Sequence, residues 1–153
     1  DMATTKNKSE GIKSLYELSF SLKRAKCPNV PHFTMKGYRD DNSNDLTRCV
    51  IDWITLNGYQ AERINSTGRQ LNIKGLNKWI PGSSTRGTAD ISATIKGRSV
   101  KIEIKCRATG DHYQSEGQKQ YQQMIERAGG VYIIVRDFQV FYEWYLKFVA
   151  DGS

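Results

Sequence analysis

Two acidic residues and one lysine are spaced so that a β-hairpin would bring their side chains together. Asp90 lies in one alternating segment, and Glu103-Ile104-Lys105 follows in the next, after twelve intervening residues. Successive side chains of a strand point to opposite faces, so Glu103 and Lys105 share a face while Ile104 points into the core. Two converging carboxylates can bind Mg²⁺, and a lysine beside them can orient a water or stabilise charge on a phosphate. This chemistry suits hydrolysis of a phosphodiester bond.

The Glu-x-Lys spacing alone has a simpler interpretation. Lys101, Glu103 and Lys105 would then be alternating charges on a solvent-facing strand, with Asp90 as an incidental surface acid. Such triplets are common on exposed strands, so the spacing by itself favours this interpretation. The motifs around the triplet are needed to choose between the two.

Four helices are predicted from the spacing of apolar side chains. Within residues 1–42, an N-terminal arm that is otherwise polar and irregular, helical spacing is confined to 12–22. Residues 45–57, 115–128 and 138–149 are predicted helices of the main domain, and glycine-containing turns end the first two of these. We expect the arm either to pack on the main domain or to help form a dimer.

Four strands complete the main domain, which spans residues 43–153. Alternation predicts strands over 59–64, 89–95 and 99–105, the last two as a hairpin, and a continuous apolar run predicts a strand buried on both faces over 131–135. The polar, glycine-containing residues between the first and second strands predict a long loop. Together these elements predict an α/β fold with a mixed central sheet flanked by helices.

The positive charge of the chain is concentrated around the two acids and the lysine. The 153 residues carry a formal net charge of +7, and the segment 59–107 contains ten basic and three acidic side chains. This segment therefore supplies the whole net charge. Lysine and arginine contacts to phosphate provide most sequence-independent affinity for DNA, so we expect a nucleic-acid partner. The alternative is a basic face that only keeps the protein in solution.

The sequence predicts neither a membrane-spanning protein nor a secreted one. No apolar run reaches the ~20 residues that span a bilayer, and the first residues lack the apolar core of a signal peptide. We therefore expect a cytoplasmic protein that is not secreted and has no membrane partner. The widely spaced Cys27, Cys49 and Cys106 form no paired zinc motif and are predicted to be reduced thiols.

Five short motifs occur in an order that is similar to that of a known nuclease family. They are Arg63-Ile64-Asn65-Ser66-Thr67-Gly68, Gly87-Thr88-Ala89-Asp90-Ile91, Ile102-Glu103-Ile104-Lys105, Gln114-Ser115-Glu116-Gly117-Gln118 and Ala128-Gly129-Gly130. In this order the chain resembles the PD-(D/E)XK nuclease superfamily, and more closely its VRR-NUC branch, whose members resemble Holliday junction resolvases. The likeness covers roughly residues 43–146, and Ala89 stands where the family usually has proline.

The resemblance implies a restriction-endonuclease-like PD-(D/E)XK core and a role for each residue of the constellation. Asp90 and Glu103 would bind Mg²⁺ or Mn²⁺, together with the backbone carbonyl of Ile104. Lys105 would position water or stabilise charge, and Gln118 would face the site from a helix and hold Lys105 or the water. The alternative for Gln118 is an exposed amide on a glutamine-rich helix.

Asp45 has two interpretations. The first helix of the family often opens with a glutamate that reaches the metal or its waters, and Asp45 is the nearest match, one methylene shorter. Asp45 would then be an additional metal ligand. It is equally a candidate for the N-cap of that helix, because an aspartate oxygen can accept hydrogen bonds from the first free backbone N–H groups.

Eight residues of the basic segment are predicted to contact nucleic acid. They are Arg63, Asn65, Ser66, Arg69, Lys74, Lys78, Arg86 and Arg107. Tyr59, Trp79 and Tyr113 are candidates for stacking on unpaired bases, but packing in the core or at its rim is the favoured interpretation for each.

The predicted function is hydrolysis of DNA phosphodiester bonds by a metal-dependent endonuclease. A branched or junction substrate, a homodimer and a bacterial or phage-infected host cell are implied by the resemblance alone. Two alternatives stay open: a nuclease that acts on RNA or on DNA without structural preference, and a catalytically silent nucleic-acid-binding module. The presence of Asp90, Glu103 and Lys105 argues against the silent module, because a lost carboxylate is the simplest sign of an inactive site.

Overall fold

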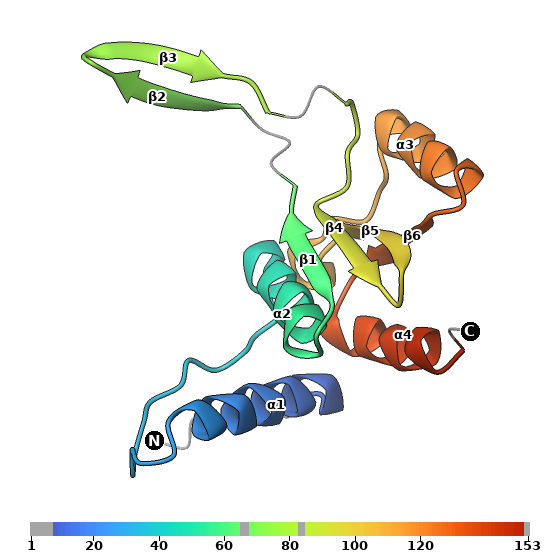
Figure 1. The fold of residues 1–153 in the computed structure, drawn as a ribbon. Helices are drawn as coiled ribbons and strands as arrows, with labels where there is room; N and C mark the ends of the chain where they lie inside the picture. The colour runs from blue at the N-terminus through green and yellow to red at the C-terminus, as the bar shows by residue number, and fades with distance from the viewer. Residues whose placement is uncertain (1–7, 65–67, 83–84, 152–153) are drawn as a thin grey trace.

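The computed structural model describes residues 8–64, 68–82 and 85–151, which form four α-helices, a short 3₁₀ helix and six strands (Figure 1). The helices are α1 (Glu10–Lys26), α2 (Ser43–Leu56), α3 (Glu116–Arg127) and α4 (Phe138–Asp151), with the 3₁₀ turn at Arg107–Thr109. The strands are β1 (Gln60–Arg63), β2 (Arg69–Ile73), β3 (Leu76–Ile80), β4 (Ile91–Ile95), β5 (Arg98–Ile104) and β6 (Val131–Val135).

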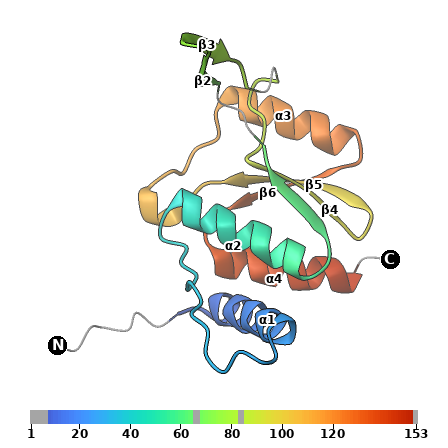
Figure 2. The ribbon, with the colours of Figure 1, turned by 60° about the vertical axis from the view of Figure 1, so that its left-hand side comes forward.

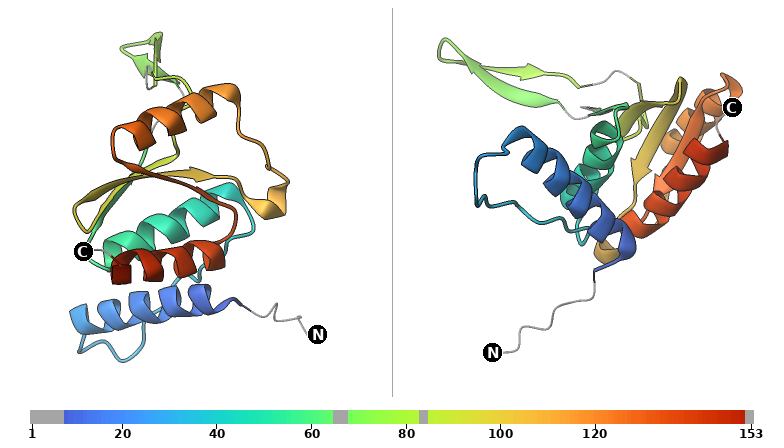
Figure 3. Two further views of the ribbon diagram at one scale, coloured as in Figure 1. Left: turned by 90° about the vertical axis from the view of Figure 1, so that its right-hand side faces the viewer. Right: turned by 60° about the horizontal axis from the view of Figure 1, so that its bottom comes forward.

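A mixed four-stranded sheet lies between two helical layers. Its order is β1-β4-β5-β6, with β1, β4 and β5 antiparallel to one another in turn and β6 parallel to β5. Helix α3 links β5 to β6 and covers one face, whereas α2 and α4 cover the other and α1 lies beyond them (Figures 2 and 3). This is the α/β architecture with a mixed, helix-flanked sheet that the sequence predicts.

Alternation along the strands divides the interior into two clusters. Ile91 and Ile102 are completely buried in the larger cluster, between the sheet and the layer formed by α2 and α4. Tyr132 of β6 faces the opposite side and packs with Ala89 and with Tyr121 of α3. Neighbouring residues of a strand thus enter different clusters. Strand β6 is covered on both faces, and the prediction from its continuous apolar run is confirmed.

Helix α1 is part of the larger cluster. Ile12 and Leu15 are buried in it, and the Ser9 hydroxyl caps the helix by accepting a hydrogen bond from the Ile12 N–H. Gly11 allows close contact with α4, because a Cβ at this position would lie 3.0 Å from the Cβ of Tyr142. The N-terminal segment therefore packs on the main domain through α1.

The stretch predicted to be a long loop contains a second hairpin. Strands β2 and β3 pair in register, and Lys74 and Gly75 form the two-residue turn with φ of 53° and 80°. The Asn72 side chain accepts a hydrogen bond from the Gly75 N–H and supports the turn. The hairpin projects away from the four-stranded sheet (Figures 1 and 3). The loop prediction is wrong because these strands bury little apolar surface and so leave no clear alternation in the sequence.

Two expectations from composition can be compared with the fold directly. Among the residues described, no helix combines the length and the apolar character needed to cross a membrane. Cys27, Cys49 and Cys106 are free thiols, and the last two are buried. Burial raises the pKa of the Cys49 thiol to about 12, so this cysteine stays protonated at neutral pH and its role is packing.

Candidate active site

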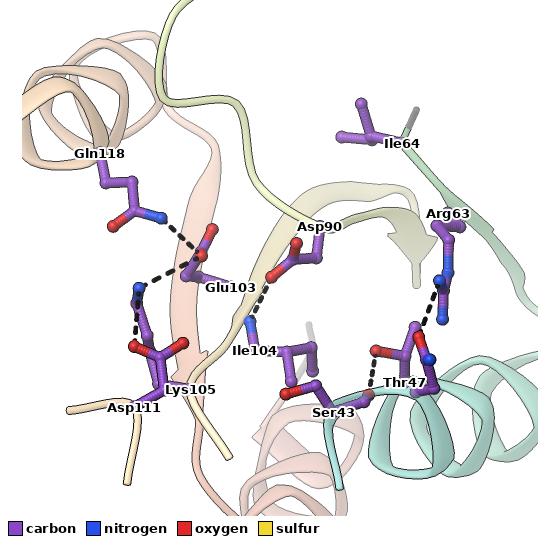
Figure 4. A pocket seen from close by; sticks show the side chains of 11 residues that line it. Ser43, Thr47, Arg63, Ile64, Asp90, Glu103, Ile104, Lys105, Asp111 and Gln118 are labelled. Carbon is purple, nitrogen blue, oxygen red and sulfur yellow. Dashed lines mark hydrogen bonds and ion pairs between the residues drawn. The ribbon is translucent and has the colours of Figure 1, made fainter. Parts of the chain in front are cut away.

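Asp90, Glu103 and Lys105 line one pocket of about 540 Å³ beside the junction of β4 and β5 (Figure 4). The rest of its wall comes from the start of α2, the end of β1, the loop after β5 and the start of α3. These lining residues are Ser43, Asn44, Thr47, Arg63, Ile64, Ile104, Asp111 and Gln118. The sequence-predicted constellation is therefore brought together, with four separate parts of the chain around it.

Asp90 is fixed on both sides by the sheet. Its backbone N–H donates to the Ile102 carbonyl at 3.1 Å, and its own carbonyl accepts from the Ile64 N–H at 2.8 Å. One carboxylate oxygen, Oδ2, accepts from the Ile104 N–H at 2.8 Å. These three bonds hold the aspartate against β5, so its charge lies close to Glu103.

Glu103 is a buried carboxyl group, and only one of its two oxygens accepts a hydrogen bond. It is 3% exposed, and its Oε1 accepts a hydrogen bond from Gln118 Nε2 at 2.7 Å. Its Oε2 is buried and accepts no hydrogen bond from the described residues, and a hydrogen bond to Asp90 becomes possible only when Glu103 is protonated. Burial, followed by repulsion from the Asp90 charge, raises the pKa of Glu103 to about 8, although Lys105 acts in the opposite direction. The two carboxyl groups therefore do not both ionise readily without a cation, and Glu103 keeps its proton at neutral pH in the metal-free protein.

Lys105 lies between two acids. Its Nζ is 3.9 Å from Glu103 Oε1 and 3.4 Å from Asp111 Oδ1, and the residue is only 7% exposed. Asp111 is a site residue that sequence reasoning missed. Its only signal is an acidic residue next to Gly110, in the turn that follows the Glu-x-Lys strand.

The burial of this face contradicts the simpler interpretation of the Glu-x-Lys spacing. Glu103 and Lys105 do not lie on a solvent-facing strand, because α3 packs over their side of the sheet. Lys101 lies on the same face but is partly exposed, and its Nζ donates to the Ser92 hydroxyl at 2.6 Å. The three alternating charges therefore have different environments along one strand.

The first turn of α3 fixes the orientation of Gln118. Ser115 is the N-cap, and its hydroxyl accepts from the Gln118 N–H while Gln118 Oε1 accepts from the Ser115 N–H. Because the amide oxygen is bound to the cap, the amide nitrogen points to Glu103. Gln118 thus holds Glu103, and the predicted contact with Lys105 does not occur in the structure.

Gly87 brings α3 close to the segment that carries Asp90. Its φ is 73°, and a Cβ at this position would overlap the carbonyl group of Gly117 in the first turn of α3. Only glycine allows this approach of two backbones without strain. The glycine of the Gly-x-x-Asp motif therefore sets the position of the carboxylate relative to Gln118.

Asp45 does not line the pocket. Asn42 is the N-cap of α2, and its side-chain oxygen accepts from the Asp45 N–H at 2.9 Å. In return, Asn42 Nδ2 donates to Asp45 Oδ2 at 2.8 Å. The N-cap interpretation of Asp45 is wrong, and its carboxylate takes part in a reciprocal cap instead. Ser43, Asn44 and Thr47 are its neighbours in α2 that reach the pocket.

Three of the arginines predicted to bind phosphate differ in their exposure and in their contacts. Arg63 lines the pocket and donates to Asn44 Oδ1 at 3.3 Å. Arg86 is exposed, and its side chain lies over Gly117 at the start of α3. Arg107 is exposed but already forms an ion pair with Asp137 at 3.3 Å. Of these three, Arg63 alone lines the pocket, and Arg86 lies against the first turn of α3.

The other predicted contacts belong to the projecting hairpin and its approach. Lys74 and Lys78 are exposed on the hairpin, and Arg69 begins strand β2. Asn65 and Ser66 lie outside the described residues. Lys74 and Lys78 thus place two exposed cations on the hairpin.

The ligand set for a metal is small. In the parts of the chain that the structure describes, no three His, Cys, Asp or Glu side chains gather into a group that could hold a metal ion. Asp90 and Glu103 form a pair of carboxylates in the pocket. Ile104 is also a lining residue, and its backbone carbonyl is the remaining donor predicted.

Comparisons with known proteins add no further assignment. No family model, curated protein or solved structure matches this chain. The chemistry of the pocket is therefore inferred from its own residues and geometry.

Proposed function

We propose that this protein is a metal-dependent DNA endonuclease that hydrolyses phosphodiester bonds, with a PD-(D/E)XK type of active site formed by Asp90, Glu103 and Lys105. The observation that carries the proposal is the convergence of these three side chains in one pocket. Their order and neighbouring motifs, which resemble the VRR-NUC branch, support the same assignment.

The residues present fit a divalent cation. Glu103 Oε2 is a buried oxygen that accepts no hydrogen bond from the described residues, and the raised pKa of Glu103 reflects burial next to the charge of Asp90. Both features favour binding of a cation between the two carboxylates, and carboxylate oxygen is the ligand type that Mg²⁺ and Mn²⁺ prefer. Asp90, Glu103 and the Ile104 carbonyl would hold it. Such an ion supplies Lewis-acid charge at the scissile phosphate and makes a water more acidic.

The protein's own groups would complete the chemistry. Lys105 can donate to a phosphate oxygen or orient the attacking water, since its ammonium group lies at the pocket wall beside Glu103. Two further residues hold these side chains in place. Asp111 forms an ion pair with Lys105, and Gln118 donates a hydrogen bond to Glu103. Arg63 would bind a neighbouring phosphate.

A branched or junction DNA substrate and a homodimer are part of the proposal and come from the resemblance. A twofold dimer would place two active sites on the two symmetric strands of a four-way junction. Sedimentation of the free protein and of its junction complex would measure this stoichiometry.

The central experiment is a cleavage assay on four DNA forms. Supercoiled plasmid, linear duplex, single strand and a four-way junction are incubated with Mg²⁺, Mn²⁺ or EDTA. The wild type is compared with Asp90→Ala, Lys105→Ala and the matched control Lys101→Ala, which removes a lysine from the same face of β5 outside the pocket. We expect Asp90→Ala and Lys105→Ala to lose about 100-fold or more in rate, and Lys101→Ala to stay near wild type.

Three results would replace the proposal. Cleavage that survives EDTA or both active-site substitutions would exclude the mechanism. Binding without cleavage would assign the chain to the nucleic-acid-binding modules. An RNA strand is incubated in parallel, and cleavage of this RNA with none of the DNA forms cut would identify a ribonuclease.

A further inference from the structure

The β2–β3 hairpin has one face made of amides and an indole. Gln70 pairs with Trp79, and Asn72 pairs with Asn77. Residues directly opposite each other in an antiparallel pair share a face, and every second residue of a strand returns to it. The four side chains therefore form one strip, which presents hydrogen-bonding groups and a ring on the same side.

Trp79 is largely exposed, and its indole is in contact with Gly68. Its residue surface is 62% exposed, so the expectation that it packs in the core or at its rim is wrong. Gly68 lies against the indole so closely that a Cβ there would overlap the ring. An indole held in this way is a flat apolar platform, and unpaired bases stack on such platforms without regard to sequence.

The charge of the hairpin favours a polyanion over a protein surface. Residues 69–80 contain three basic side chains and no acidic one. Lys74 lies at the tip, whereas Lys78 alternates with Asn77 and Trp79 along β3 and so lies on the opposite face from the strip. The opposite face carries exposed Ile73 and Leu76 together with Lys78, and the two apolar side chains are the surface that a second copy of the chain would cover. The two faces therefore make different predictions that can be tested separately.

The hairpin is connected to the proposed active site at both ends. The chain enters it from Ile64, which lines the pocket, and returns from it to Gly87 and Asp90. The hairpin and the pocket are thus neighbours along the chain, and the hairpin projects from the side of the sheet where β1 ends (Figure 1).

We propose that the β2–β3 hairpin binds unpaired nucleotides, with Trp79 stacking on a base and Lys74 at the tip contacting a flanking phosphate. This inference rests on the proposed nuclease function for its biological meaning, and it names the feature that selects branched or frayed DNA over continuous duplex. A paired and stacked base offers no free face to the indole, whereas an unpaired base does.

The test is equilibrium binding in EDTA, so that no cleavage takes place. Fluorescence anisotropy measures the affinity of the full chain for a fluorescein-labelled single strand and for its fully paired duplex of equal length. Trp79→Ala should weaken single-strand binding by about 10-fold or more, since stacking on one aromatic is worth roughly that factor, and should change duplex binding by less than about twofold. Trp79→Phe keeps a ring and should retain most of the affinity.

Leu76→Asn is the matched control, because Leu76 is 75% exposed on the opposite face of the same hairpin. It should leave both affinities within about twofold of wild type. Equal losses for Trp79→Ala and Leu76→Asn, or equal losses on single strand and duplex, would overturn stacking. A Leu76→Asn protein that sediments as a smaller species than wild type would assign the hairpin to self-association instead.

The binding result is independent of the nuclease result. A protein that never cuts DNA but loses single-strand affinity with Trp79→Ala would fail the proposed function and support the hairpin. If the protein cuts DNA while the Trp79→Ala variant binds single strand with unchanged affinity, the proposed function is supported and the hairpin proposal fails.

Discussion

Replacement of Glu103 by glutamine should stabilise the metal-free protein at neutral and alkaline pH. The side chain is buried, and burial together with the charge of Asp90 raises the pKa of Glu103 from 4.5 to about 8. Ionisation of Glu103 is therefore less favourable in the folded protein than in the unfolded chain. Glutamine has nearly the same shape, carries no charge, and can still accept a hydrogen bond from Gln118.

The sign and size of the effect follow from the two pKa values. Below the unfolded pKa, 4.5, Glu103 is protonated in both states and contributes no pH dependence. As the pH rises from there to about 8, the unfolded chain loses the proton while the folded protein keeps it. The free energy of unfolding then falls by about 1.4 kcal/mol per pH unit, or about 5 kcal/mol over the whole interval. Above about pH 8 the loss levels off.

The assay is denaturant unfolding of wild type and Glu103→Gln in EDTA across this pH interval. The other titrating groups are common to both proteins, so the difference in unfolding free energy isolates Glu103. We expect the variant to gain on the wild type by about 1.4 kcal/mol per unit of rising pH. Any change in hydrogen bonding caused by glutamine adds a constant, so a difference that does not vary with pH would refute the reasoning. Adding Mn²⁺ at alkaline pH should stabilise the wild type much more than the variant.

Two further predictions concern how the fold positions the site. Gly87→Ala should destabilise the protein by more than about 1 kcal/mol in denaturant unfolding, because it adds overlap with Gly117 to the cost of positive φ. Gly58→Ala is the control, since Gly58 has positive φ and no neighbour within 4 Å and so measures the cost of positive φ alone. Equal losses of stability in the two variants would contradict the packing argument. Leu15→Ala should cost about 2–5 kcal/mol, whereas Leu22→Ala on the exposed side of α1 should cost far less; no loss from Leu15→Ala would place α1 outside the core.

The two hairpins show what the sequence pattern can detect. Ile73-Lys74-Gly75 and Ile95-Lys96-Gly97 form the same kind of turn, with positive φ at both lysines and both glycines. Only the second hairpin was predictable, because β4 and β5 bury one face and therefore alternate between apolar and polar residues. Alternation reports burial, not strand pairing. A hairpin exposed on both faces gives almost no such signal.

A similar limit applies to the charges of β5. The alternation predicts that Glu103 and Lys105 share a face, and in the structure both line the same pocket, with Lys105 directly after the end of β5. What covers that face depends on α3, which follows β5 in the chain and packs over it after a connection of irregular structure. Asp111 lies in this connection, so neither the burial of the lysine nor its second acidic partner was visible in local sequence.

Gln118 shows how a common helix-start motif can also serve a functional site. Ser115 and Gln118 form a capping box, for which glutamine and glutamate are both suitable in sequence terms. In this fold the cap uses only the side-chain oxygen, and the remaining group of the side chain faces Glu103. Glutamate at this position would complete the cap but place a second acceptor against a carboxylate that already lacks partners for one oxygen. The amide is therefore required by the carboxylate and not by the helix, which separates Gln118 from the other glutamines of α3.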